Sequence, residues 1–172
     1  MLFLTNDAPD AAAAVSEAAS AVGAALEKAE ITGKPAGAMV LPDGCVVTGK
    51  TSPLLGASAA LLLNALKHMA GIDHKLELIP ASVIEPISAM KTDYLGHRNP
   101  RLHSDEVLIA LAISGLTNPL AALVQEQLKK LRGCEAHFSV IISEEDAKLY
   151  KRLGINVSCE PRYEVKSLYH KK

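Results

Sequence analysis

The sequence predicts a three-layer α/β sandwich, in which a mixed sheet of about five strands has helices on both faces. Three observations support this fold class. Hydrophobic residues make up 49% and charged residues 22% of the 172 residues, which is typical of one globular domain with its own core. Short apolar runs alternate with longer helical segments. Asp43 and Gly44 join two of these runs, which indicates an antiparallel hairpin at the edge of the sheet.

The chain is expected to begin with a helix, the hairpin and a second helix. An Ala-rich helix covers residues 1–30 and is interpreted as a linker remnant or an added helix, separate from the α/β domain of residues 31–165. The hairpin pairs residues 37–42 with residues 45–48. Ser52 and Pro53 should cap and open the next helix, which runs to about Ala70. That helix is apolar on almost every side, which predicts burial.

The remaining elements alternate between strands and helices. Asn118 with Pro119 is typical of a helix start, and Ser143 of a helix N-cap. Residues 166–172 are interpreted as a solvated basic tail. We expect strands at residues 76–79, 136–142 and 155–159, and helices at residues 82–94, 105–114, 117–132 and 144–153.

Composition also limits the classes of partner. The net charge of −1, the 3% of aromatic residues and the absence of Trp argue against nucleic-acid binding, which needs a basic surface or stacking rings. The longest apolar run, residues 57–63, is too short to span a membrane. The three cysteines lack regular spacing, so we expect reduced thiols in a cytoplasmic protein.

Residues 44–51 match the phosphate-loop motif G-x-x-x-x-G-K-[ST] letter for letter. A nucleotide site of this kind needs the residues between the two glycines to curl around the phosphates. Here those residues are β-formers that follow a hairpin turn, and a strand would place Gly44 about 20 Å from Lys50. We therefore expect no triphosphate site.

A smaller anion site is expected just before the predicted second helix, because backbone N–H groups at a helix N-terminus favour negative charge. Gly49, Lys50, Thr51 and Ser52 would form it. The alternative is that Ser52 only caps the helix and Lys50 is solvated. Further side chains would join this site if the fold brings them near it: Asn64, Lys67, Asn118 and Arg132.

A second candidate site lies at residues 132–137. Glu135 and His137 would share one face of a strand, where a carboxylate beside an imidazole can perform acid–base chemistry. The alternative is a half-buried histidine beside an arginine-capped helix end. Cys134 and His137 have the C-x-x-H spacing of a zinc site but lack two further ligands, so no metal is expected.

Several stretches together carry a resemblance to a known family: Leu41-Pro-Asp-Gly44, Thr48-Gly-Lys-Thr-Ser-Pro-Leu54, Ala60-Leu-Leu-Leu-Asn-Ala65, Asp105-Glu-Val-Leu-Ile-Ala-Leu111, Thr117-Asn-Pro119, Leu131-Arg-Gly-Cys-Glu-Ala-His137 and Leu153-Gly-Ile-Asn156. From Ile31 onward the chain resembles the C-terminal part of uncharacterised protein family 0371. These bacterial proteins are much longer, and some are labelled ATP-dependent peptidases. The resemblance implies a truncated or split member that lacks a large N-terminal portion.

The hairpin, the buried helix and the strand after it also look like the start of the cytidine-deaminase fold, which implies a deaminase-like topology. In deaminases the helix supplies a zinc-binding His or Cys and a Glu, and the next helix opens with a cysteine pair. Residues 56–60 contain no His, Cys or Glu, and residues 80–84 contain no Cys. The resemblance therefore extends to shape and not to zinc chemistry.

Three functions follow as hypotheses, and none of them calls for a cofactor. The first is a non-catalytic C-terminal module, or one that binds a small anionic, phosphate-bearing ligand near Lys50. The second is an enzyme, either an ATP-dependent hydrolase of the peptidase type or an acid–base enzyme that uses Glu135 and His137. The third is a structural module that forms homo-oligomers or packs against the missing N-terminal region.

Overall fold

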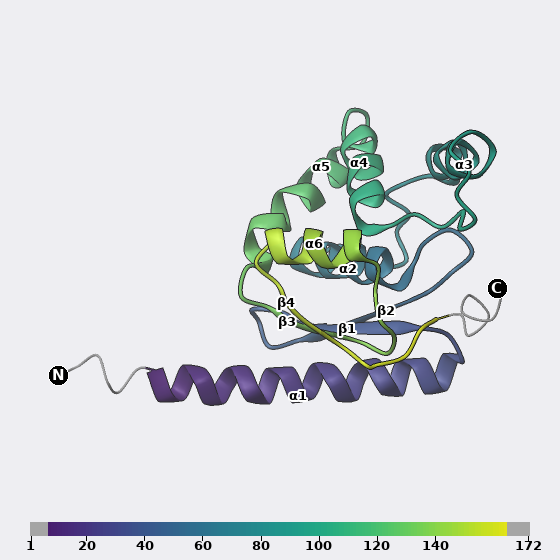
Figure 1. Cartoon of the computed structure of the whole chain (residues 1–172). Coiled ribbons are helices and arrows are strands. Elements are labelled where there is room, and N and C mark those ends of the chain that lie inside the picture. Colours follow the sequence, from purple (N-terminus) through teal and green to yellow (C-terminus); the bar gives the residue numbers. More distant parts are fainter. Residues whose placement is uncertain (1–6, 165–172) are drawn as a thin grey trace, which may run out of the picture.

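A four-stranded sheet separates one long helix from the other helices within residues 7–164, the part of the chain that the computed structural model describes (Figure 1). The strand order is β2-β1-β3-β4. β1 pairs antiparallel with β2 and β3, and β3 pairs parallel with β4. The strands are β1 (Ala36–Val40), β2 (Val46–Lys50), β3 (Glu135–Phe138) and β4 (Asn156–Cys159).

Helix α1 forms one layer by itself, and the other helices cover the opposite face of the sheet (Figure 1). α2 contacts β1 and β2, α6 contacts β4, and α4 and α5 pack on α2. The α/β fold class with helices on both faces is therefore confirmed. The helices are α1 (Asp7–Thr32), α2 (Ala57–Met69), α3 (Ala81–Ala89), α4 (Ser104–Ser114), α5 (Pro119–Glu126) and α6 (Glu144–Arg152), with a π-helical turn at Met90–Tyr94 and a 3-10 turn at Gln127–Leu131.

Small residues allow α1 to pack closely against the sheet. Ala36 and Ala38 of β1 point toward α1 and are fully buried, as are Ala21 and Ala25 of α1. Because side chains alternate along a strand, Met39 points to the other face and enters the main core. The Ala-rich composition of the N-terminal segment therefore serves a close helix–sheet contact.

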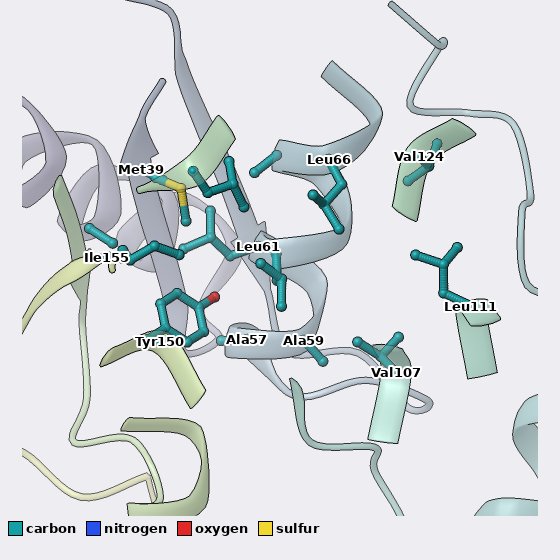
Figure 2. Close-up of a cluster of buried hydrophobic side chains, with 14 of the residues drawn as sticks. Met39, Ala57, Ala59, Leu61, Leu66, Val107, Leu111, Val124, Tyr150 and Ile155 are labelled. Atoms are coloured by element: carbon teal, nitrogen blue, oxygen red, sulfur yellow. The ribbon is translucent and has the colours of Figure 1, made fainter. Parts of the chain in front are cut away.

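The main core lies between the sheet and α2 (Figure 2). Leu61 and Leu66 of α2 are fully buried there, together with Phe138 and Tyr150. The two rings pack edge to face with their centroids 5.6 Å apart. The Tyr150 hydroxyl, which faces this core, donates a hydrogen bond of 2.7 Å to the carbonyl oxygen of Ser58.

The hairpin is confirmed, but the predicted start of the following helix is wrong. Val40 pairs with Val46, and Gly44 has a φ of 84°, a left-handed conformation that favours glycine. Ser52 does not begin α2. Its Oγ accepts the N–H groups of Leu54 and Leu55, so it caps a tight turn, and α2 starts at Ala57.

The strand predicted at residues 76–79 is also wrong, which leaves four strands where about five were expected. The carbonyl oxygen of Leu76 accepts a hydrogen bond from the buried Lys67 ammonium, at 2.5 Å, instead of pairing in a sheet. Leu78 and Ile79 are buried as loop residues, so their apolar character reflects the core. β3 ends at Phe138, earlier than predicted. The deaminase-like topology stays a prediction.

No helix within residues 7–164 is long and apolar enough to cross a membrane. The predicted basic tail at residues 166–172 lies outside the described residues. So does the end of the predicted domain, at residue 165.

Candidate functional site

The phosphate-loop match lies on a β-strand. Residues 46–50 form β2, and Gly49 pairs with Gly37 of β1. A Cβ atom on Gly49 would fall on the backbone of Leu61, so the glycine allows α2 to approach the strand closely. The residues between the motif's two glycines are extended and do not curl around a triphosphate, as the sequence predicted.

An internal carboxylate lies at the N-terminus of α2. Asp146 Oδ2 accepts a hydrogen bond of 2.6 Å from Ser58 Oγ, and Oδ1 accepts bonds of 2.9 and 2.5 Å from the N–H and the hydroxyl of Ser104. Burial alone would raise the pKa of the Asp146 carboxyl. The hydrogen bonds from His103, Ser104 and Ser58 outweigh it and hold that pKa well below its usual range. One buried anion thus joins the starts of α2, α4 and α6.

A cleft with a volume of about 820 Å³ opens beside β2, the strand at one edge of the sheet. Its walls come from β2, from α1, from the end of α2 and from the loop that follows α2. The residues that line it are Lys28, Val47, Thr48, Asn64, His68, Gly71, Ile72, Asp73, His74 and Lys75.

The loop wall of this cleft is held by the predicted ligand residue Lys67. Its ammonium is buried and donates hydrogen bonds to the carbonyl oxygens of His74, at 3.0 Å, and Leu76, at 2.5 Å. Burial lowers the pKa of Lys67. Lys67 therefore positions the loop and does not point toward Lys50 at the far end of β2.

The cleft carries a local excess of positive charge. Neither Lys28 nor Lys75 forms an ion pair with another residue in the described part of the chain. The one carboxylate in the cleft, Asp73, accepts the N–H of Lys75 and lies 3.6 Å from Nδ1 of His74. Asn64, also predicted as a ligand residue, donates to the carbonyl oxygen of Thr48 at 2.9 Å.

The other predicted ligand residues lie on separate elements. Lys50 is exposed at the end of β2, whereas Thr51 is buried. Asn118 caps α5 by accepting the N–H of Leu120. Arg132 is exposed where the 3-10 turn ends, against Gly154. Of the predicted set, Asn64 is the residue that lines the cleft.

The predicted acid–base pair does share one face of β3, but each residue has its own partner. Glu135 accepts a hydrogen bond of 2.9 Å from the side chain of Asn156. His137 is buried, with Nδ1 2.6 Å from Ser158 Oγ and Nε2 3.2 Å from Glu160 Oε1. The arrangement is a Ser–His–Glu series across β3 and β4, with Ser158 exposed to solvent.

Burial disfavours the thiolate form of Cys134. Burial raises the pKa of its thiol to about 11, and the nearby carboxylates of Glu17 and Glu135 act in the same direction.

Sequence reasoning missed the lysines and histidines of the cleft, namely Lys28, His68, His74 and Lys75. Residues 73–75 could have indicated a site at His74 and Lys75, because they are three consecutive polar residues shortly after Gly71, where a helix is predicted to end. Lys28 had no such signal, because its place in the cleft depends on how α1 docks on the sheet.

Residues 17–169 match the family described as domain of unknown function DUF1846, C-terminal. The chain is 52% identical over 151 residues to UPF0371 protein CE2832 of Corynebacterium efficiens, covering 88% of this chain and 30% of that protein. It is 50% identical over 147 residues to a UPF0371 protein of Streptococcus pneumoniae serotype 19F, covering 86% of this chain and 30% of that protein. The chain thus spans about a third of the length of these relatives.

Proposed function

Because the chain belongs to the UPF0371 family, within its C-terminal domain of unknown function DUF1846, we propose that it is a module that binds a small anionic ligand in the cleft beside β2. The family resemblance read from the sequence is confirmed by these matches. The ligand class is a phosphate-bearing small molecule. The site assigned to it is the cleft, and not the stretch around Lys50.

The observation that carries the proposal is a cleft of suitable size that contains two ammonium groups, neither of them ion-paired within residues 7–164. The volume of about 820 Å³ falls within the roughly 300–1,000 Å³ of small-molecule sites. Lys28 and Lys75 come from different elements and supply positive charge, while His68 and His74 supply N–H groups. Asp73 is occupied by contacts within its own loop.

The first prediction concerns these two lysines. The Lys28→Ala, Lys75→Ala double variant should weaken binding of a sugar phosphate or nucleotide by about 100-fold or more, because a hydrogen bond to a charged group contributes about 1.5–3 kcal/mol. Isothermal titration calorimetry of the full chain with inorganic phosphate, nucleotides and sugar phosphates measures this loss.

Two single variants sharpen that experiment. Lys148→Ala removes a lysine on α6 away from the cleft and should leave the affinity unchanged. If Lys50→Ala weakens binding and the double variant does not, the ligand lies at the end of β2 and the cleft assignment is wrong. Lack of heat with every phosphate compound would reject the proposed function.

The Ser–His–Glu series favours a second candidate function, acyl transfer with Ser158 as nucleophile. With its proton on Nε2, His137 donates to Glu160 and accepts the Ser158 hydroxyl proton at Nδ1. A nucleophile beside a base that is itself oriented by a third group is the pattern of an activated serine. This candidate differs from the acid–base hypothesis of the sequence analysis, because the carboxylate beside His137 is Glu160 and not Glu135.

The second prediction tests this candidate with a fluorophosphonate, which labels activated serines. Ser158 should be labelled, and Glu160→Gln and His137→Gln should slow labelling by about 100-fold or more, because general-base assistance contributes 10²–10⁴-fold. Peptide mass spectrometry identifies the labelled serine. Ser82→Ala, which changes a serine in α3, is the control. Labelling at Ser158 that proceeds equally fast in both variants would remove the candidate.

A further inference from the structure

Three side chains of types that bind metals lie close together where the hairpin turn contacts the end of α2. Asp43 and Cys45 belong to the turn between β1 and β2, and His68 lies in the last turn of α2. One ligand atom from each, a carboxylate oxygen, a thiol sulfur and an imidazole nitrogen, lies within 4.8 Å of the other two. Asp43 and His68 are 25 positions apart in the sequence, which explains why no sequence motif reveals the cluster.

A closed turn fixes the Asp43 carboxylate and the backbone of Cys45. Leu41 donates its N–H to the carbonyl oxygen of Cys45, and Gly44 donates to that of Leu41, both at 2.8 Å. Asp43 Oδ1 accepts the N–H of Cys45 at 2.9 Å. Its second oxygen, Oδ2, lies 2.8 Å from Nε2 of His68. One oxygen is therefore held by the backbone, as in outer-shell support of a metal ligand, while the other faces the histidine.

We propose that Asp43, Cys45 and His68 bind a divalent cation of the zinc type, with three protein ligands and one open position. Carboxylate oxygen, thiolate sulfur and imidazole nitrogen are the ligands that Zn²⁺ uses, whereas Mg²⁺ and Ca²⁺ prefer oxygen. Bonds of about 2.0–2.3 Å place neighbouring ligand atoms of a tetrahedral site about 3.3–3.8 Å apart. Small rotations of these side chains would reach that spacing.

The contact that the cation would replace is a weak one. The His68 and Asp43 side chains are 37% and 49% exposed, and water and salt screen an ion pair at such a surface position. Displacing it therefore costs little compared with metal coordination. Three protein ligands with an open fourth position are the pattern of zinc sites that also hold water or a ligand.

The cation site adjoins the cleft and shares one residue, His68, with it. His68 lines the cleft, but Asp43 and Cys45 do not, and neither Lys28 nor Lys75 belongs to the cluster. The inference therefore does not rest on the proposed anion binding, and the Lys28→Ala, Lys75→Ala variant should bind the cation as the wild type does.

Cobalt provides the third prediction, because Co²⁺ takes the ligand sets of Zn²⁺ and its thiolate complexes absorb visibly. Titration of the reduced full chain with Co²⁺ should give one ion per chain and a sulfur-to-cobalt charge-transfer band, which Zn²⁺ then displaces. The single variants Cys45→Ser, His68→Gln and Asp43→Asn should each lower the affinity by more than about 100-fold, since loss of an outer-shell partner alone costs 10–100-fold.

Two matched variants serve as controls. Cys159→Ser removes another free thiol and His97→Gln removes another exposed imidazole, and both should keep the wild-type spectrum and affinity. Absence of the charge-transfer band from the wild type would overturn the proposal. So would a spectrum that survives Cys45→Ser or disappears in Cys159→Ser, because the thiolate would then come from elsewhere.

Discussion

Replacing Asp146 by alanine should lower the free energy of unfolding by about 3–5 kcal/mol, the usual cost of removing one partner from a buried charged network. The carboxylate is 5% exposed and accepts hydrogen bonds from Ser58 and Ser104. Without the carboxylate, the hydroxyls of Ser58 and Ser104 and the N–H of Ser104 lose their acceptor and stay buried near three helix N-termini. Each buried polar group without a hydrogen-bond partner costs about 1–3 kcal/mol. Urea denaturation followed by circular dichroism measures the loss.

A neighbouring residue supplies the control for this variant. Glu145 lies in the same first turn of α6 but is exposed, so Glu145→Ala should change the free energy of unfolding by about 0.5 kcal/mol or less. If both variants lowered the free energy of unfolding equally, the negative charge in the first turn of α6 would matter and the hydrogen bonds of Asp146 would not.

The pH dependence of stability should also identify Asp146. Its folded pKa lies below the ordinary value of 3.8, so its contribution is complete above that value and is lost as the pH falls through the folded pKa. Between about pH 5 and pH 2 the wild type should therefore lose more stability than Asp146→Asn, which cannot ionise there. Parallel stability curves for the two proteins would contradict the lowered pKa.

Replacing Gly49 by alanine should lower the free energy of unfolding by about 3 kcal/mol or more, or prevent folding, because overpacking against backbone cannot be relieved by a rotamer change. The new Cβ would lie 2.5 Å from Cα of Leu61 and 2.8 Å from the carbonyl carbon of Ala60. Relief would require α2 to move away from β2, which opens the core around Leu61. Expression of folded protein and thermal denaturation measure the effect.

Gly23 provides the matched control. A Cβ atom on Gly23 would meet nothing within 4 Å, and the residue lies inside α1. Gly23→Ala should therefore be neutral or stabilise the protein by about 0.5–1 kcal/mol, through higher helix propensity. If Gly49→Ala were tolerated equally well, close packing would not be the role of Gly49 and the phosphate-loop hypothesis would merit a new test.

Local rules account for the elements that the sequence predicted well. Asp43 with Gly44 makes a hairpin, Asn118 caps α5 and Ser143 caps α6, because each depends on a side chain and a few backbone groups close to it in sequence. Ser52 shows the limit of such rules. A serine followed by proline can cap a helix or a turn with the same hydroxyl, and in this structure Ser52 caps the turn that precedes α2.

The candidate site was less predictable than the fold, because it depends on contacts between distant segments. Asn64 was the predicted ligand residue that proved to line the cleft. Lys67 was singled out for its charge, yet the structure uses that charge to hold carbonyl groups of the following loop. A sequence shows that a lysine is present, but burial and partners decide whether it can meet a ligand.

By itself, the sequence determined the α/β class, the hairpin, most helix starts, the family and the extended state of the phosphate-loop match. Only the tertiary structure decided that Asp146 joins three helix N-termini, that His137 lies between Ser158 and Glu160, and that Asp43, Cys45 and His68 meet. Ser58 and Asp146 are 88 residues apart, and His137 and Glu160 are 23 apart. Such pairs leave no periodicity or spacing in the chain, because their geometry arises only when the sheet forms and the helices dock on it.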